Sequence, residues 1–470
     1  MHAAEYLERR AFFRRTAAGL GSIALGDLLA QDSSPLTPKP SHAAAKAKCV
    51  IFLFMSGAPS QLDLLDPKPA MAKRHGQPMP LSMIKDLKDD LIRGSATVMA
   101  SPRRFQRYGG SGIEFSELLP NLGQCADDLC VIRSMRTDNA NHTPAQFLLN
   151  TGSIVAGRPS IGSWALYGLG SESRNLPGFV VMLSSSDKKG VEGGAANWSN
   201  GFMPSHYRGV TFRNQGDAVL HLSNPEGITP AMQRSRLDFV RGLNEERAAL
   251  TGDPEIASRV AAYELAFRMQ TAAPELLDFS GESAATLEMY GVGRDPTHTY
   301  GSNCLLARRM VERGVRFVQI YHSSWDDHND LRKNLDRHCS ITDRPAAALL
   351  TDLKRRGLLD STLVVWGGEF GRTPMNEVRR GNTPGREGRD HHAQAFTVML
   401  AGGGVRGGQV LGRTDDFGYH VVEDPFHVHD LQATILHCLG LEHTRLTYPF
   451  QGRQYRLTDV HGEAIRKALV

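Results

Sequence analysis

The sequence predicts an α/β fold, a doubly wound and mainly parallel β-sheet with helices on both faces. Continuous apolar runs of strand length, each ending in Gly, Ser, Asp or His, are typical of strands buried on both faces. Helical patterns fall between these runs, so strands and helices alternate along the chain. The six predicted strands lie at 49–55, 129–135, 178–185, 315–322, 361–366 and 395–401.

The first strand and the first long helix follow directly from local patterns. "CVIFLFM" at 49–55 contains no charged residue, which predicts a strand in the middle of the sheet. Residues 256–270 place Val260, Tyr263 and Phe267 at i, i+3 and i+7. This spacing puts the three side chains on one face of a helix, so the stretch predicts a helix that packs on the core.

The later helices are predicted from their ends as well as their periodicity. The stretches 298–313 and 343–357 each end at a glycine, Gly314 and Gly357, and glycine is the residue best suited to a left-handed C-cap. "HDLQATILHCLGL" at 429–441 offers an early Asp as a capping residue and a Gly near its end. In doubly wound sheets, ligands bind beyond the carboxyl ends of the strands, so side chains there are the functional candidates.

The chain of 470 residues divides into a leader, a linker and one large domain. Residues 1–30 contain "ERRAFFRR" before a Gly/Ala-rich apolar stretch, which resembles a twin-arginine export signal and predicts a periplasmic or cell-envelope location. An amphipathic basic helix is the alternative, and the stretch is too interrupted to span a bilayer. Residues 31–48 read as a linker and 49–470 as one domain, with an irregular excursion around 186–250 over the ligand-binding edge.

The composition excludes several classes of protein. Hydrophobic residues make up 41% and charged residues 22%, which are ordinary values for a globular chain. The net charge of +4 is small, and the basic residues are scattered, so no nucleic-acid partner is expected. Six cysteines without a C-x-x-C pair do not predict structural zinc or a disulfide scaffold, and one or two bridges at most are expected. "GGGVRG" at 402–407 lacks the following helix that a dinucleotide-binding loop needs.

Four polar groups lie next to predicted strand ends, where the fold would bring them to one edge of the sheet. Ligand sets that mix carboxylates with imidazoles suit Zn, Mn or Fe, whereas sets made only of oxygen atoms favour Ca or Mg. The groups could instead form a network of structural hydrogen bonds, since a carboxylate after a strand often caps a helix. The candidate residues are Ser56, Ser60, Asp63 and Asp66; Asp326, Asp327, His328 and Asp330; Glu369 and Arg372; and Asp390, His391 and His392.

With these residues collected, the chain resembles the sulfatase-like family called domain of unknown function 1501, within the alkaline phosphatase superfamily. The resemblance rests on "FMSGAPSQLDLLDPKP", "WDDHND", "VVWGGEFGRTP", "GRDHH" and "GRQYRLTDVHGEAI", and it covers nearly all of 49–465. Sulfatases carry a cysteine that is oxidised to formylglycine, in the motif C-x-P-S-R followed by T-G. In "NHTPAQFLLNTG", His142 takes the place of that cysteine, so formylglycine chemistry is not expected.

The resemblance implies an exported, metal-dependent hydrolase of phosphate or sulfate esters, with one or two divalent ions such as Zn or Mn. Thr143 is the expected nucleophile, and His142 or water are the alternatives. Arg372 is expected to pair with substrate oxygens. Phe370 stands where the superfamily has a histidine ligand, which makes one metal easier to build than two. The implied metal ligands are Asp63, Asp326, His328, Glu369, Asp390 and His391.

The alternative function is a pseudoenzyme of the cell envelope that binds anionic glycans or other anionic ligands without turnover. His142 and Phe370 favour this alternative, and the surviving Asp/His set favours catalysis. The partner is in either case an anionic small molecule or glycan.

Overall fold

The computed structural model describes residues 36–85, 87, 90–184, 190–214, 216–377 and 385–470. The predicted export signal at 1–30 and the first residues of the predicted linker lie outside the described residues. Within the part that is described, no helix is both long enough and apolar enough to cross a membrane.

The main sheet is mixed and mostly parallel, which confirms the predicted fold class. Its strands run in the order β12-β4-β11-β8-β1-β7-β5-β6, and β15 pairs with β4. Strands form at all six predicted positions. The bounds are β1 Cys49–Met55, β4 Leu129–Arg136, β5 Phe179–Leu183, β6 Val210–Phe212, β7 Phe317–His322, β8 Thr362–Gly367, β11 Phe396–Ala401, β12 Gln409–Leu411 and β15 Phe426–His427.

The strand β11 is antiparallel to both of its neighbours, β4 and β8. The other pairings in the main sheet are parallel. The amino end of β11 therefore lies at the same edge as the carboxyl ends of β1, β7 and β8. Residues that precede β11 in the sequence thus reach the edge where ligands bind in such sheets.

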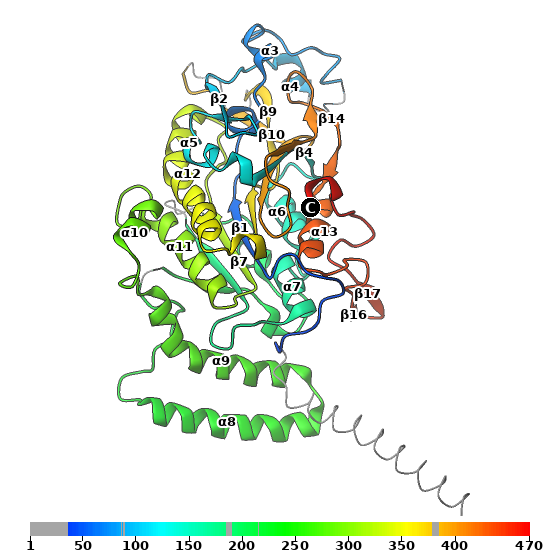
Figure 1. Cartoon of the computed structure of the whole chain (residues 1–470). Helices are drawn as coiled ribbons and strands as arrows, with labels where there is room; N and C mark the ends of the chain where they lie inside the picture. Colours follow the sequence, from blue (N-terminus) through cyan, green and yellow to red (C-terminus); the bar gives the residue numbers. More distant parts are fainter. Residues whose placement is uncertain (1–35, 86, 88–89, 185–189, 215, 378–384) are drawn as a thin grey trace, which may run out of the picture.

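The alternation of β1 side chains divides the core into two layers. Ile51 and Leu53 pack into one layer with α11 and α12, and Val50 and Phe52 pack into the other with α6, α7 and α13. Helices therefore cover both faces of the sheet (Figure 1). The bounds of these helices are α6 His142–Thr151, α7 Ile161–Leu169, α11 His298–Glu312, α12 Leu331–Arg355 and α13 Val428–Cys438.

The helix prediction for 343–357 covers only the second half of α12, which begins at Leu331. The first half is missed because it is rich in polar residues and is followed by Pro345, a residue that usually ends a helix. The predictions for 298–313 and 429–441 agree with α11 and α13 to within a few residues, and 256–270 lies inside α9, Pro254–Leu277.

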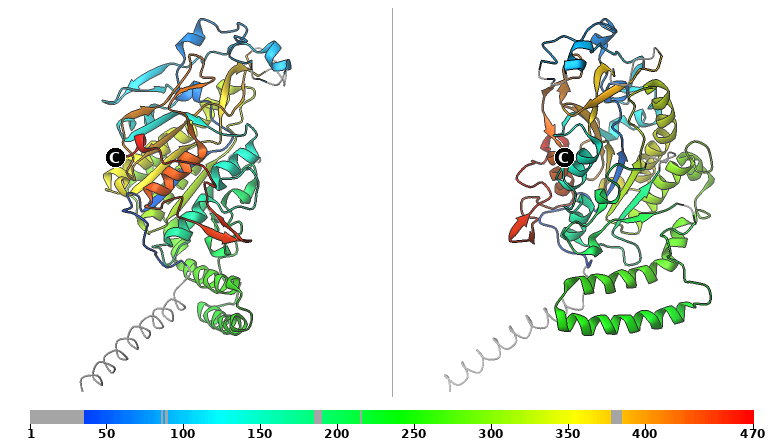
Figure 2. Two further views of the ribbon diagram at one scale, coloured as in Figure 1. Left: turned by 90° about the vertical axis from the view of Figure 1, so that its right-hand side faces the viewer. Right: turned by 180° about the vertical axis from the view of Figure 1, so that it is seen from behind.

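The predicted irregular excursion contains more regular structure than expected. Its end forms α8, Pro230–Thr251, which begins where Thr229 Oγ1 accepts a hydrogen bond from the Met232 N–H and ends at Gly252 with φ of 64°. The hairpin of α8 and α9 projects from one end of the molecule, and the strands β9, Gly371–Asn376, and β10, Arg389–His392, lie toward the other end (Figure 1 and Figure 2). Among the described residues of this segment, Gly194–Trp198 packs on α6, which begins at the ligand-binding edge.

Short elements complete the fold. The short strands pair as β2 Phe105–Tyr108 with β3 Ile113–Ser116, β9 Gly371–Asn376 with β10 Arg389–His392, β13 Arg413–Thr414 with β14 Val421–Glu423, and β16 Tyr448–Phe450 with β17 Arg453–Tyr455. The short helices are α2 Gln61–Leu64, α3 Pro69–Ala72, α4 Asp90–Ser95, α5 Pro120–Gly123 and α10 Ala284–Tyr290. All six cysteines are buried, and none is paired in a disulfide.

Candidate metal centre

Loops from the middle of the sheet and the start of α6 bring the site residues together. Asp326 follows β7, and Glu369 follows β8. His391 lies on β10, just before the antiparallel β11, and His142 is the first residue of α6, after β4. Because β7, β1 and β8 are neighbours, these side chains meet at one edge of the sheet.

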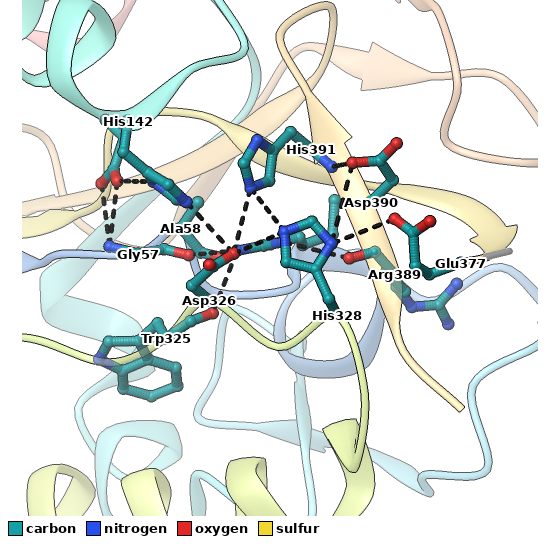
Figure 3. Close-up of polar contacts among 12 residues, drawn as sticks. Gly57, Ala58, His142, Trp325, Asp326, His328, Glu377, Arg389, Asp390 and His391 are labelled. Atoms are coloured by element: carbon teal, nitrogen blue, oxygen red, sulfur yellow. Dashed lines mark hydrogen bonds and ion pairs between the residues drawn. The ribbon is translucent and has the colours of Figure 1, made fainter. Parts of the chain in front are cut away.

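The carboxylate of Asp326 stands at the centre of three imidazoles (Figure 3). Its Oδ1 lies 3.2 Å from His142 Nε2, 2.9 Å from His328 Nε2 and 3.1 Å from His391 Nε2. The Nε2 atoms of His328 and His391 are 2.9 Å apart. The same ring nitrogen of all three histidines therefore points at one place.

The other ring nitrogen of each histidine meets an oxygen that can only accept a hydrogen bond. His142 Nδ1 lies 2.5 Å from Glu369 Oε1, His328 Nδ1 3.1 Å from Glu377 Oε2, and His391 Nδ1 2.6 Å from the carbonyl oxygen of Ala140. Each Nδ1 is therefore placed to donate a proton to its oxygen, and Nε2 is the ring nitrogen that would bind a metal at the centre. This arrangement is typical of metal-binding histidines.

The donor set fits a divalent metal. Tetrahedral zinc with bonds of about 2.0–2.1 Å to nitrogen and oxygen places neighbouring ligand atoms roughly 3.3 Å apart. The Nε2 and Oδ1 atoms of this cluster lie 2.9–3.2 Å apart where they are in direct contact. Two overlapping groups among the described residues could hold an ion: His142, Asp326 and His391, and His328, Asp390 and His391. Because His391 belongs to both groups, the cluster fits one ion better than two.

The pKa values of His142 and Asp326 show that the two carboxylates of the cluster favour positive charge beside them. Burial lowers the pKa of His142, but hydrogen bonds to Asp326 and Glu369 outweigh burial and raise the pKa to about 9. Burial disfavours the charged form of Asp326, yet the bonds from the three histidines hold its pKa well below the usual range. For Asp327, which has no such partners, burial raises the pKa to about 7.

Arg372 fixes the position of Asp326. Its Nη2 donates to Asp326 Oδ1 at 2.8 Å, and its Nε donates to the Ala58 carbonyl at 3.0 Å. Its side chain is 0% exposed, and its remaining donors bind the carbonyls of Gly57, Trp325 and Arg389. The guanidinium is thus used within the protein, beneath the carboxylate it orients, and the structure places no Arg372 donor at the open side of the site.

The loop after β1 supports Glu369 from below. The Gly57 N–H donates to Glu369 Oε1 at 3.0 Å, and Gln146 Nε2 donates to the same oxygen at 3.1 Å. Gly57 has φ of +109°, and a Cβ there would lie 2.7 Å from the Asp326 nitrogen. Only glycine therefore allows the loops after β1 and β7 to approach this closely.

Two predicted site residues lie outside this cluster. Asp63 is buried in an ion pair with Arg389, 2.8 Å from its Nε, and accepts a hydrogen bond from Ser60 at 2.5 Å. The Thr143 hydroxyl donates to Glu192 Oε2 at 3.3 Å, and it makes no hydrogen bond to the Asp326 carboxylate within the described residues. The structure therefore brings together His142, Asp326, His328, Glu369, Asp390 and His391, with Arg372 beneath them.

Sequence reasoning missed the groups that orient the histidines. Glu377 ends the stretch "GGEFGRTPMNE" but is not among the candidate residues, and the carbonyl of Ala140 and the N–H of Gly57 are backbone groups that carry no side-chain signal. Gln146 stands where the sulfatase motif has its arginine, and nothing in the sequence marks it as a partner of Glu369. These groups come close to the histidines only in the folded chain.

Glu377→Gln is expected to weaken metal binding about 10–100-fold, because changes to a hydrogen-bond partner of a metal-binding histidine typically have this effect. The Glu377 carboxylate accepts a hydrogen bond from His328 Nδ1 and so favours the ring tautomer with its proton on Nδ1. The glutamine side chain can also donate through its NH2 group, and it therefore favours this tautomer less strongly. The dissociation constant for zinc, measured by competition with a chelating dye, checks the effect. Glu114→Gln, which changes a carboxylate far from the cluster, is the matched control, and equal constants for both variants would contradict the assignment.

A comparison with protein families places most of the chain in one of them. The model of the family described as "Protein of unknown function (DUF1501)" matches residues 47–469. The comparison with curated proteins gave no match.

Several solved structures are similar to this chain, all at low identity. The alkaline phosphatase from the Antarctic bacterium TAB5 is 12% identical with a TM-score of 0.32, over 84% of this chain and 98% of that chain. The phosphonate monoester hydrolase SpPMH from Silicibacter pomeroyi is 14% identical with a TM-score of 0.33, over 74% and 71%. The lipoteichoic acid synthase LtaP from Listeria monocytogenes is 10% identical with a TM-score of 0.33, over 90% and 78%.

Proposed function

The chain belongs to the DUF1501 family, and from this premise we propose that it is a metal-dependent hydrolase of phosphate or sulfate esters that works outside the cytoplasm. One observation carries the proposal: three histidines direct Nε2 at Asp326 Oδ1, and each is oriented by an oxygen on its Nδ1. A divalent metal bound there supplies a Lewis acid and lowers the pKa of a water ligand toward neutrality.

The residues of the cluster have two different roles, metal binding and positioning of a ligand. His142, His328, His391 and Asp326 would hold the metal, and Arg372 keeps the Asp326 carboxylate in place. The Asp326 side chain is 29% exposed, against 8% for His328 and 10% for His142, so the cluster is open to substrate on the Asp326 side.

An anionic ester fits this site because α6 begins at it. His142 and Thr143 form the first turn of α6, and the side chain of Asn141 does not cap their N–H groups. Free N–H groups at the start of a helix favour an anion. Because histidine at position 142 cannot be converted to formylglycine, we propose that water attacks the phosphorus or sulfur atom. The ester P–O or S–O bond breaks, and the alcohol leaves with a proton taken from the attacking water.

Export is part of the proposal and is supported by the twin-arginine-like sequence at Arg9 and Arg10. Fractionation of cells that express the full chain tests it. Recovery of all the protein in the cytoplasm would contradict this part.

Removal of the metal is expected to abolish hydrolysis and to lower stability by about 3 kcal/mol when the free metal stands near 100 times its dissociation constant. Aryl phosphate, phosphodiester and sulfate substrates, each with Zn or Mn, before and after treatment with a chelator, give the measurement. Activity should disappear with the chelator and return with added metal. Full activity in the metal-free protein would overturn the proposal.

Thr143→Ala is expected to keep at least about half of the activity, because the Thr143 hydroxyl donates to Glu192 and, within the described residues, makes no hydrogen bond to the Asp326 carboxylate. A fall of more than about 1,000-fold in kcat would instead make Thr143 the nucleophile, since loss of such a group removes most of the catalysis. The variant Thr151→Ala, at the other end of α6, is the control for helix stability.

A second candidate is a pseudoenzyme that binds anionic glycans without turnover. Phe370 favours it, because its buried ring lies 4.8 Å from the His142 ring and 4.7 Å from the His391 ring and supplies no ligand atom. Binding of a sulfated glycan that depends on the metal, together with no turnover in the substrate screen, would support this candidate over the hydrolase.

A further inference from the structure

A second cavity lies far from the metal cluster. It has a volume of about 800 Å³ and lies between α9, the edge strand β6 and the loop before β5. Pockets of this size hold drug-sized organic ligands. None of its lining residues belongs to the metal cluster. The strand β6 is the last strand of the main sheet, and α9 lies at the end of the molecule away from β9 and β10 (Figure 1).

Four arginines line this cavity, which is therefore called the arginine pocket. Arg174 lies before β5, Arg208 and Arg213 flank β6, and Arg268 lies on α9. The lining residues include no Asp or Glu, and the carboxylate that interacts with Arg268, Glu264, lies outside the lining. Arg268 Nε donates to the carbonyl of Arg174 at 2.7 Å, which joins α9 to the loop before β5. The pocket thus concentrates positive charge that no carboxylate lining it neutralises.

The rest of the lining is mixed, with serine, threonine, asparagine and histidine side chains beside an apolar wall. Leu176 is buried, Val219 and Leu265 are half-buried, and Leu220 is 64% exposed. An exposed leucine beside a concave apolar wall indicates an apolar surface whose burial by a ligand would be favourable. Free phosphate or sulfate would satisfy the arginines but leave this wall in water, so the lining calls for a ligand with both an anionic and an apolar part.

We propose that the arginine pocket binds a free amphipathic organic anion, with a carboxylate head against the arginines and an alkyl body against the leucines. Arginine binds carboxylates through paired hydrogen bonds, which suits a planar head group. Burial of the alkyl chain adds the hydrophobic contribution. This binding is independent of the proposed hydrolase activity.

Calorimetric titration of the full chain with decanoate, below its micelle concentration, tests the proposal. We expect a dissociation constant of about 10 μM, within the range of small-ligand sites, and weaker binding of both 1-decanol and acetate by at least about tenfold, because each lacks one of the two parts. The double variant Arg208→Gln/Arg213→Gln should weaken decanoate binding at least about tenfold, since it removes two charge-assisted contacts. The variant Leu220→Ser should weaken decanoate but not acetate.

Arg236→Gln/Arg247→Gln is the matched control, because it removes the same net charge from exposed positions on α8 outside the pocket. Decanoate binding equal in the two double variants, or decanol binding as tight as decanoate, would overturn the proposal. Binding only to vesicles that contain anionic lipid would also overturn it, since the occupant would then be a membrane surface. Asp326→Ala should leave decanoate binding unchanged, which separates this test from that of the hydrolase.

Discussion

Asp326→Ala is expected to abolish metal binding and hydrolysis together. The Asp326 Oδ1 is the atom on which His142, His328 and His391 converge, so its loss removes a ligand and the centre of the cluster. Changes to groups that only orient a ligand weaken metal binding about 10–100-fold, and we expect a loss of more than 100-fold here. Metal content after dialysis, measured by atomic emission, and kcat/KM for the best ester substrate are the measurements.

The variant also leaves the buried guanidinium of Arg372 without its carboxylate, so its stability must be measured separately. Asp326→Asn keeps an oxygen for Arg372 and should fold like the wild type while still losing the metal. Asp128→Ala is the matched control, because its side chain is 27% exposed against 29% for Asp326 and it pairs only on the surface. A folded Asp326→Asn protein with full metal content would refute the metal centre.

Asp63→Asn is expected to lower the free energy of unfolding by about 3–5 kcal/mol and to leave the metal bound, because it breaks a buried ion pair. Asp63 is 1% exposed and Arg389 is 0% exposed, and the Arg389 donors also bind the carbonyls of Met99 and Thr373. Urea unfolding and metal content are measured together. Loss of the metal at unchanged stability would instead restore Asp63 as a ligand.

The dependence of this effect on pH has a definite sign. Burial raises the pKa of Asp63, but Arg389 outweighs it and lowers the pKa below that of an unfolded aspartate. The contribution is therefore complete above about pH 4 and is lost as the pH falls through the lowered pKa. The matched control is Arg386→Met, which breaks an exposed ion pair with Asp330 and should change stability by less than about 1 kcal/mol.

The fold could be predicted because buried strands and capped helices leave local signals. The strand at Cys49–Met55 and the helix that ends before Gly314 each follow from a few adjacent residues. The helix α8 was missed because it packs mainly on α9 and leaves Phe239 and Leu250 exposed, so its apolar pattern does not describe a core face. The polar first half of α12 was missed for a related reason. It has neither a preceding Gly or Pro nor a continuous apolar run to mark where the helix starts.

The site could be predicted in composition but not in arrangement. Carboxylates and imidazoles at strand ends indicated Asp326, His328 and His391, since parallel strands share an edge. The sequence could not indicate that β11 is antiparallel, which is what brings His391 to that edge from before a strand. Nor could it separate Asp63 from the cluster, because the partner that holds it, Arg389, is more than 300 residues away in the chain.

The order of the cluster along the chain has a consequence for biosynthesis. His142, Asp326, His328 and His391 are spread over more than half of the sequence, and His391 joins them only when β10 and β11 have left the ribosome and packed. A nascent chain therefore holds no complete ligand set until nearly all of it has been made. If the cluster binds a metal as proposed, we expect metal loading to follow folding and not to nucleate it, in contrast to zinc fingers, which are unfolded without their metal.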